Sequence, residues 1–351
     1  MTPRPQHRFS PMISSFIRIH SCLLLWLSLS TIAYAQELNR YEFSQVQMGT
    51  TFRLVFYTQN DSTAQLAARA SFQKIEQLNQ ILSDYLPESE LNRLSAAAGN
   101  GQWVTLSKDL WNVLFQAQQF ARQSNGGFDV TAGLIIRLWR RARRKQEWPD
   151  SSRLAQALKK TGFKYLKLKR KSQQAKLKLK GMRLDLGGIA KGYAVDQALY
   201  SLQSYGIEHA LVDGGGDMRA SKAPPGQKAW KIALEGKANE IILLTHRAVA
   251  TSGDLYQFLA IDGVRYSHIV NPHTGLGLTH QCQVTVIAPS CMKADALASA
   301  ISVTGAQKAK GLLKKKSETY FQINCPLSKD TGVYQSPGFE HYLNNNPSIL
   351  K

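Results

Sequence analysis

The segment from Leu184 to Ala198, LDLGGIAKGYAVDQA, constrains this chain more than any other. It leads from an apolar strand pattern through Asp185 and the pair Gly187-Gly188 to Lys191, and then into a helical pattern. A tight glycine turn at a helix start exposes backbone N–H groups and the positive end of the helix dipole. Such a turn can hold an anion, most often a phosphate, to which Lys191 would add a full positive charge. Taken alone, the same pattern also suits a plain strand-to-helix connection.

The first 35 residues have the pattern of a targeting segment. Three arginines and no acidic residue accompany an apolar run, which the small-residue site Ala33-Tyr34-Ala35 follows. This order predicts a secretory signal peptide over residues 1–35, because the run is too short to span a bilayer. Cys22 lies at the start of the run, whereas the cysteine of a lipoprotein would lie at its end. We therefore expect an exported, periplasmic protein without a lipid anchor.

Residues 36–351 are long enough to bury a sizeable core. Strand and helix patterns are interleaved along them without a repeated βαβ unit, which favours an α+β fold. Hydrophobic periodicity predicts two strands joined at residues 48–50, and helices over residues 62–82, 106–124, 153–160, 190–205 and 292–304.

Three cysteines remain after residue 35: Cys282, Cys291 and Cys325. An odd number allows one disulfide and one free thiol, and no CxxC pair is present. The sequence leaves the pairing open, including a Cys282–Cys291 bond.

The net charge of +20 is concentrated in one segment. Residues 137–180 hold 17 lysines and arginines against two acidic residues, and the rest of the mature chain is close to neutral. Part of this segment alternates leucine and lysine with period two, as in a hairpin with one buried and one solvated face. We favour a solvated face and expect no nucleic-acid partner. A transient contact of residues 137–180 with an acidic protein or an anionic membrane surface stays open.

Other segments have residue types that suit ligand chemistry. A glycine-rich turn over residues 212–218 carries Asp213 and Asp217 at its ends. Asp295 and Ser299 lie four residues apart, so that both side chains share one face of the predicted last helix. A carboxylate and a hydroxyl at this spacing can reach one hard cation, which prefers oxygen ligands. Each of these patterns is weak by itself.

In their order along the chain, these patterns resemble the ApbE family of FAD:protein FMN transferases. The resemblance extends from about Tyr41 to Gly305 and is carried by the segments MGTTF, SDYLPESELNRLS, GGFDVTAG, LDLGGIAKGYAVD, VDGGGDM, TSGD, SHIVNPHTG and VIAPSCMKADALA. It implies a single ApbE-like, T-fold-like domain over residues 36–351, with mixed sheets flanked by helices.

The resemblance also implies an activity. Family members bind FAD and Mg²⁺, and transfer FMN to a Thr or Ser hydroxyl of a target protein with release of AMP. The acceptor would then be a protein with a Thr/Ser flavinylation motif, such as a redox-pump subunit or an exported reductase.

By motif position, the resemblance assigns Mg²⁺ to Asp295, Ser299 and the backbone carbonyl of Gly188. The family usually has Thr where this chain has Ser299, which keeps the hydroxyl. The positions that correspond to FAD contacts are Met48, Tyr85, Gly127, Phe128, Asp129, Asp185, Lys191, His268 and Ile269.

Two of these residues suit catalysis. Opening a diphosphate requires neutralisation of charge on its oxygens, which a divalent cation and Lys191 can provide. The attacking hydroxyl needs a base, and His268 is the better candidate because an unperturbed imidazole titrates near neutral pH. His273 is the weaker alternative. Tyr85 and Phe128 offer flat faces to an aromatic ring of FAD, although either can equally be core packing.

Three alternatives remain. The same site could serve an FAD pyrophosphatase that uses water and produces FMN and AMP. A catalytically silent flavin-binding protein is disfavoured, because such a protein would not need the metal ligands. The third is a basic module that binds anionic surfaces through residues 137–180, with strong salt dependence.

Overall fold

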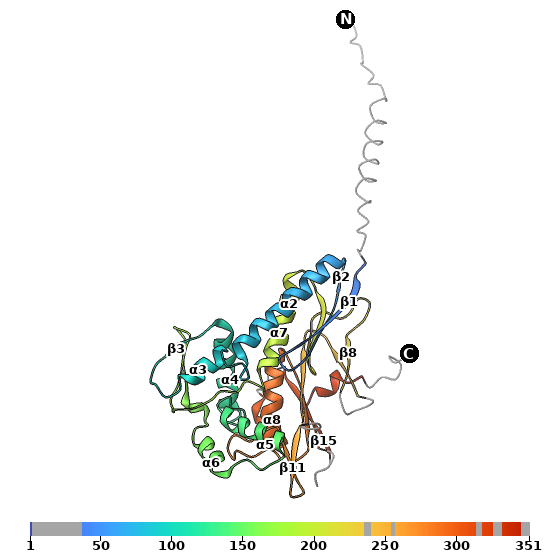
Figure 1. Ribbon diagram of the computed structural model, residues 1–351. Coiled ribbons are helices and arrows are strands. Elements are labelled where there is room, and N and C mark those ends of the chain that lie inside the picture. Colours follow the sequence, from blue (N-terminus) through green and yellow to red (C-terminus); the bar gives the residue numbers. More distant parts are fainter. Residues whose placement is uncertain (2–36, 235–239, 254–256, 314–317, 326–331, 345–351) are drawn as a thin grey trace. The chain divides into compact units, whose positions relative to one another are not determined.

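Eight strands form the main sheet of the computed structural model (Figure 1). Their order in the sheet is β1 (Asn39–Gln47), β2 (Thr50–Thr58), β6 (His209–Gly214), β7 (Asp217–Ala220), β10 (Ala248–Ser252), β13 (Gln283–Ala288), β14 (Tyr320–Cys325) and β15 (Gly332–Gln335). The α+β class is confirmed. The named strands pair antiparallel throughout the described residues, so the sheets are antiparallel rather than mixed. The reason is that tight turns join several sequential neighbours, and only antiparallel strands can be joined in this way.

The structure describes Met1 and residues 37–234, 240–253, 257–313, 318–325 and 332–344. The chain divides into two units, Met1–Glu37 and Leu38–Lys351. The expected signal peptide lies outside the described residues, except for Met1. Within the described ranges, every helix is too short or too polar to cross a membrane.

Three helices cover one face of the main sheet: α2 (Asp61–Leu82), α7 (Ala190–Ser204) and α8 (Cys291–Leu312), as Figure 1 shows. The alternation of side chains along a strand determines which residues meet them. Leu54 and Phe56 of β2 point into the core beneath the helices, whereas Val55 between them points to the opposite face. All three side chains are buried, so the sheet is covered on both sides.

A small hairpin covers the opposite face. It consists of β8 (Trp230–Ala233) and β9 (Ile241–Leu244), and its apolar residues Trp230 and Ile242 pack with Val55 and with Phe339 of a 3-10 helix, Phe339–Tyr342. This second core explains why the central strands are apolar on both faces.

The remaining elements belong neither to the main sheet nor to the β8–β9 hairpin. They are β3 (Val104–Thr105), β4 (Leu166–Lys169), β5 (Gln174–Leu177), β11 (Phe258–Ile261), β12 (Val264–Ser267), α3 (Glu90–Ala96), α4 (Lys108–Gln123), α5 (Gly133–Lys145), α6 (Ser151–Lys159) and a 3-10 turn at Phe163–Tyr165. The leucine and lysine repeat forms the β4–β5 hairpin with buried Leu166 and Leu177, which confirms the period-two prediction. The last predicted helix continues beyond residue 304 after an interruption at Gly305, whose φ of 76° is not helical.

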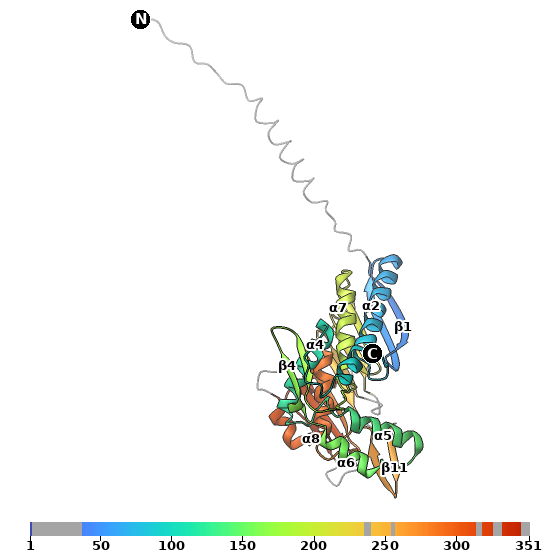
Figure 2. The same cartoon turned by 60° about the vertical axis from the view of Figure 1, so that its left-hand side comes forward.

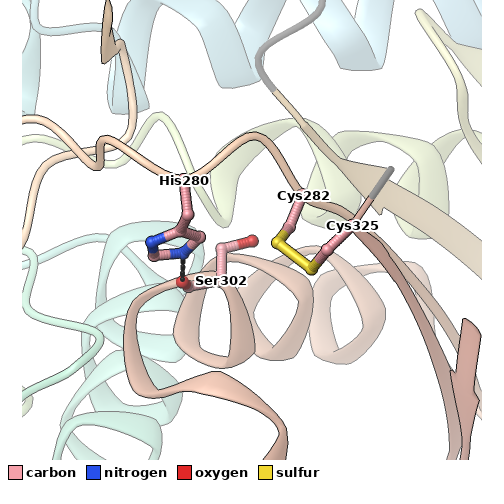
Figure 3. The surroundings of a disulfide bond; sticks show 4 residues. All are labelled: His280, Cys282, Ser302 and Cys325. Carbon is pink, nitrogen blue, oxygen red and sulfur yellow. Dashed lines mark hydrogen bonds between the residues drawn. A yellow bond between two sulfur atoms is a disulfide. The ribbon is translucent and has the colours of Figure 1, made fainter. Parts of the chain in front are cut away.

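The disulfide joins Cys282 to Cys325, and Cys291 is free and buried. The next residues inward, Gln283 and Asn324, are partners in the β13–β14 register, so the two half-cystines lie side by side. A Cys282–Cys291 bond, which the sequence left open, is therefore not formed. Figure 3 shows the bond above α8, close to Ser302. The two half-cystines are 43 positions apart in the sequence, and the segment between them contains the whole of α8.

Candidate active site

One cavity of about 970 Å³ is lined by residues from many separate segments of the chain. Its wall includes the turn before α7, the loop after α4, the β6–β7 turn, one face of α8 and the segment after β12. All of the residues assigned to a site from the sequence line this cavity: Met48, Tyr85, Gly127, Phe128, Asp129, Asp185, Gly188, Lys191, His268, Ile269, Asp295 and Ser299. The fold therefore brings together residues that are up to 251 positions apart in the sequence, Met48 and Ser299.

The turn before α7 is held by backbone hydrogen bonds. Asp185 N–H donates to the carbonyl of Val130 at 2.9 Å, and the N–H of Gly187 donates to Asp185 Oδ1 at 2.9 Å. A Cβ at Gly188 would lie 2.8 Å from Ser299 Oγ, so the absence of a side chain lets this backbone approach α8 closely. The turn thus places Gly188 directly against Ser299.

Helices α7 and α8 meet at a second glycine. A Cβ at Gly192 would lie 2.5 Å from the carbonyl oxygen of Cys291, and the N–H of Gly192 donates to Asp295 Oδ2 at 3.2 Å. Asp295 is only 7% exposed. Burial and the nearby carboxylate of Asp217 raise the pKa of Asp295 to about 7, although Lys191 opposes the shift. Asp295 is therefore a buried acid in a position that disfavours its negative charge.

Lys191 forms an ion pair with Asp217, a residue at the first position of β7. Asp217 is almost completely buried, whereas 31% of the Lys191 side chain is exposed. Burial alone would lower the pKa of Lys191, but the carboxylates of Asp217 and Asp295 outweigh it and raise this pKa above its ordinary value. We did not assign Asp217 to the site from the sequence, although its place in the glycine-rich turn over residues 212–218 was the available signal.

The donors on this wall suit Mg²⁺. Among the described residues, no three His, Cys, Asp or Glu side chains cluster as a metal site. Asp295, the hydroxyl of Ser299 and the carbonyl of Gly188 offer oxygen atoms only, and Asp217 adds negative charge nearby. Mg²⁺ is commonly held by one or two carboxylates together with water and substrate phosphates, so a set with few carboxylates fits this ion.

Arg140 of α5 connects two acids at another part of the wall. Its Nη2 lies 2.7 Å from Asp185 Oδ2, and its Nη1 donates a hydrogen bond to Asp84 Oδ2. The guanidinium also lies over the ring of Tyr85, with 4.4 Å between Cζ and the ring centroid. Burial raises the pKa of Asp185 to about 6, with a further contribution from Asp84 and an opposing one from Arg140. Arg140 was not predicted, because it lies inside the basic segment and looked like one of its many solvated cations.

Tyr85 is 70% exposed, and its ring lies at the wall of the cavity rather than in the core. Phe128, by contrast, is buried and packs edge-on against Phe120, with ring centroids 6.3 Å apart. Of the two aromatic residues, Tyr85 therefore has the freer face.

Asp129 has partners within the protein on both carboxylate oxygens. Oδ1 accepts hydrogen bonds from the N–H and the hydroxyl of Thr131 at 2.8 and 2.7 Å, and Oδ2 accepts one from the N–H of Phe163 at 2.7 Å. Burial raises the pKa of Asp129 against the opposing effect of these hydrogen bonds. The carboxylate thus joins the loop after α4 to the turn after α6.

The two candidate bases, His268 and His273, differ in whether they line the cavity. His268 lines the cavity, and its Nδ1 lies 3.2 Å from the carbonyl oxygen of Gln257. His273 is exposed, does not line the cavity, and lies against Gly126. A carbonyl partner at Nδ1 favours the tautomer with the proton on Nδ1, which leaves the lone pair on Nε2.

The fold and the cavity together define an α+β protein with one large cavity of mixed polar and apolar lining, built where α7 and α8 meet the glycine-rich β6–β7 turn of an antiparallel sheet. The sequence pattern of the ApbE family matches residues 48–321, and the chain belongs to this family.

Individual relatives agree with this assignment. The FAD:protein FMN transferase of Haemophilus influenzae is 28% identical over 321 residues, which cover 87% of this chain and 92% of the relative. The enzyme of the same name from Treponema pallidum is 30% identical over 302 residues, with coverage of 80% and 83%. By class, the chain is a transferase, like these relatives.

Solved structures support the same fold. The flavin transferase ApbE from Vibrio cholerae matches with a TM-score of 0.77 and 28% identity, covering 88% of this chain and 100% of that chain. The ApbE protein from Thermotoga maritima matches with a TM-score of 0.77 and 28% identity, covering 87% and 99%.

Proposed function

We propose that this protein transfers the FMN half of FAD to a Thr or Ser hydroxyl of an acceptor protein, with Mg²⁺ and with release of AMP. The observation that carries the proposal is the meeting of Gly188, Ser299 and Asp295 on one cavity wall, with Lys191 beside them. These groups combine oxygen donors for a cation with a positive charge for an anion. A diphosphate bound with Mg²⁺ requires both.

In the proposed reaction the acceptor hydroxyl oxygen bonds to the phosphorus of the FMN half, and the bond from that phosphorus to the bridging oxygen breaks. AMP leaves with the bridging oxygen. Nε2 of His268 takes the proton of the hydroxyl, and the Gln257 carbonyl keeps the imidazole in the required tautomer. Lys191 stabilises negative charge on the diphosphate oxygens.

Asp295, Ser299 and Gly188 would hold Mg²⁺ in this scheme. When bound, the ion would neutralise charge on the phosphate oxygens. The buried Asp295 carboxylate has a raised pKa because its charge is poorly balanced, and a cation would remove this imbalance. Tyr85 and Arg140 would form a support for an aromatic ring of FAD.

The acceptor is proposed to be an exported protein. The signal-peptide pattern over residues 1–35 supports export of this chain. The Cys282–Cys325 disulfide also supports it, because such bonds persist mainly in oxidising compartments. A redox-pump subunit or an exported reductase with a Thr-containing flavinylation motif is the kind of acceptor we expect.

Incubation with FAD, Mg²⁺ and a candidate acceptor tests the proposal. The best candidate is a protein with a Thr-containing motif that is encoded beside this one. Flavin fluorescence that stays with the denatured acceptor in a gel, together with one AMP per flavin, is the expected result. Replacing the motif Thr by Val in the acceptor should abolish the label. Free FMN and AMP with an unlabelled acceptor would instead indicate an FAD pyrophosphatase, and bound FAD that stays intact would indicate a silent binder.

A further inference from the structure

Helix α5 carries cations on two neighbouring faces. Ile136, Arg140 and Arg143 line the active-site cavity. Arg137, Arg141 and Arg144 have the same spacing, shifted by one residue, and line a second concavity of about 640 Å³. A shift of one residue turns a helix by about 100°, so one helix forms a wall of both spaces.

The second concavity is a groove between α5 and α6, two helices that lie next to each other in Figure 2. Arg153 and Lys160 reach it from the α6 side, and Leu134, Leu138 and Ala157 give it an apolar floor. We call this space the α5–α6 groove. Six of its lining residues are Lys or Arg, and none is Asp or Glu.

The cations of the groove differ from those of the cavity in their partners. Arg140, on the cavity side, is held between Asp84 and Asp185. Arg137, Arg141 and Arg144 are exposed, and in the part of the chain that the structure describes no acid lies within ion-pair distance of them. Their mutual repulsion is therefore unrelieved, and an anionic ligand would relieve it.

We propose that the α5–α6 groove binds an acidic segment of the acceptor protein and so guides the acceptor to the cavity mouth. This inference rests on the proposed function, because a transferase of that kind must bind a second polypeptide. The groove carries the charge opposite to that of an acidic segment, and its apolar floor suits the side chains between the acids. Helix α5 forms a wall of both the groove and the active-site cavity. A bilayer surface is flat and would contact the rims of a groove rather than its floor, so a polypeptide fits better than a membrane.

The test compares two variants with the same loss of charge. The groove variant carries Arg137→Gln, Arg141→Gln and Arg144→Gln. The control variant carries Lys171→Gln, Lys178→Gln and Lys180→Gln, three exposed residues of the basic segment that line neither space. None of the six residues lines the active-site cavity, so both variants should bind FAD as the wild type does.

The probe is a fluorescein-labelled peptide of alternating Glu and Ser, and fluorescence anisotropy measures its binding to the full chain without FAD. We expect binding to the wild type that weakens with added salt. In the groove variant it should weaken about tenfold, because three charge contacts are lost, and in the control variant less than about twofold. The Michaelis constant for the acceptor in the transfer assay should rise in parallel, with kcat unchanged.

Equal weakening in both variants would overturn the inference, because it would show attraction to total charge alone. Binding that the groove variant keeps would overturn it too. A parallel experiment measures binding to vesicles of phosphatidylglycerol and phosphatidylcholine. If the wild type binds these vesicles more tightly than the peptide, and the groove variant does not bind them, the ligand of the groove is a membrane instead. Because peptide binding needs no FAD, it tests the role of the groove independently of the transfer reaction. A wild type that binds the peptide but labels no acceptor would contradict the proposed function and would leave the groove as a site for acidic peptides.

Discussion

Lys191, in the first turn of α7, is ion-paired with Asp217, 26 residues later at the start of β7. The carboxylate of Asp295 lies near enough to raise the pKa of the same lysine. One cation therefore faces two acids, and the group carries a net negative charge when all three are ionised. A divalent cation would reverse that sign and make the wall attractive to a diphosphate. This relationship leads to the first two predictions.

The pair should stabilise the fold as a unit. Replacing Lys191 by Met leaves two buried acids without their cation, and we expect the free energy of unfolding to fall by about 2 kcal/mol, less than for a fully buried pair because Lys191 is partly exposed. Asp217→Asn should cost a similar amount. In the double variant the loss should be clearly smaller than the sum, as urea unfolding of all four proteins can measure. Additive losses would mean that the two side chains stabilise the fold independently.

Removal of the Asp295 carboxylate should abolish the metal requirement together with the activity. Asn keeps an oxygen for the N–H of Gly192 but loses the charge, so we expect Asp295→Asn to fold normally and to lose at least about a hundredfold in Mg²⁺-dependent transfer. Asp213→Asn is the matched control, since Asp213 belongs to the same hairpin as Asp217 but does not line the cavity. EDTA should reduce the wild-type rate to the level of Asp295→Asn. Normal transfer by this variant would exclude Asp295 as a metal ligand.

Two glycines of the α7 segment should respond differently to alanine. At Gly188 the new Cβ meets the hydroxyl of Ser299, a side chain that can rotate away, so transfer should fail while the melting temperature stays nearly unchanged. At Gly192 the Cβ meets the backbone of Cys291, which cannot move without separating the helices. There we expect a loss of about 2 kcal/mol in stability. Thermal unfolding and transfer rates of Gly188→Ala and Gly192→Ala distinguish the two effects, and equal melting temperatures would contradict the packing argument.

Asp185 should make stability depend on pH in a defined direction. Its pKa of about 6 in the folded protein exceeds its ordinary value of 3.8, so the folded state binds the proton more tightly than the unfolded state. This contribution therefore makes the wild type more stable as the pH falls from about 7 to about 4, by at most about 3 kcal/mol, since one pKa unit corresponds to about 1.4 kcal/mol.

The variant Asp185→Asn lacks this titration. The measurement is the free energy of unfolding of both proteins in urea at several pH values, and the difference, wild type minus variant, should increase as the pH is lowered. A difference that is constant with pH, or that decreases on acidification, would show that the ion pair with Arg140 outweighs burial and that the pKa of Asp185 is not raised.

Local patterns along the chain were sufficient to predict many of the helices and strands. The spacing of apolar residues predicted the helix after Gly188 and the leucine and lysine hairpin, because these patterns depend on the period of a single element. The spacing of Asp295 and Ser299 placed both on one helix face for the same reason. The motifs, through their resemblance to a family, led to residues that all line one cavity.

The partners of these residues depended on the tertiary structure. Three of these contacts join segments that are far apart in sequence. They are the ion pair of Lys191 with Asp217, the ion pairs of Arg140 with Asp84 and Asp185, and the disulfide between Cys282 and Cys325. The role of Arg140 could not be predicted from the sequence, because Arg140 is one of many cations in residues 137–180.

The sequence by itself thus determined the elements, the residue types of the site and the family. Only the tertiary structure decided which charges neutralise one another and which stay exposed. The physical reason is that a periodic pattern reports which side of its own helix or strand is buried, whereas an ion pair depends on how two elements pack. Arg140 and Arg141 are adjacent on α5, yet one is bound between two acids and the other lines the α5–α6 groove.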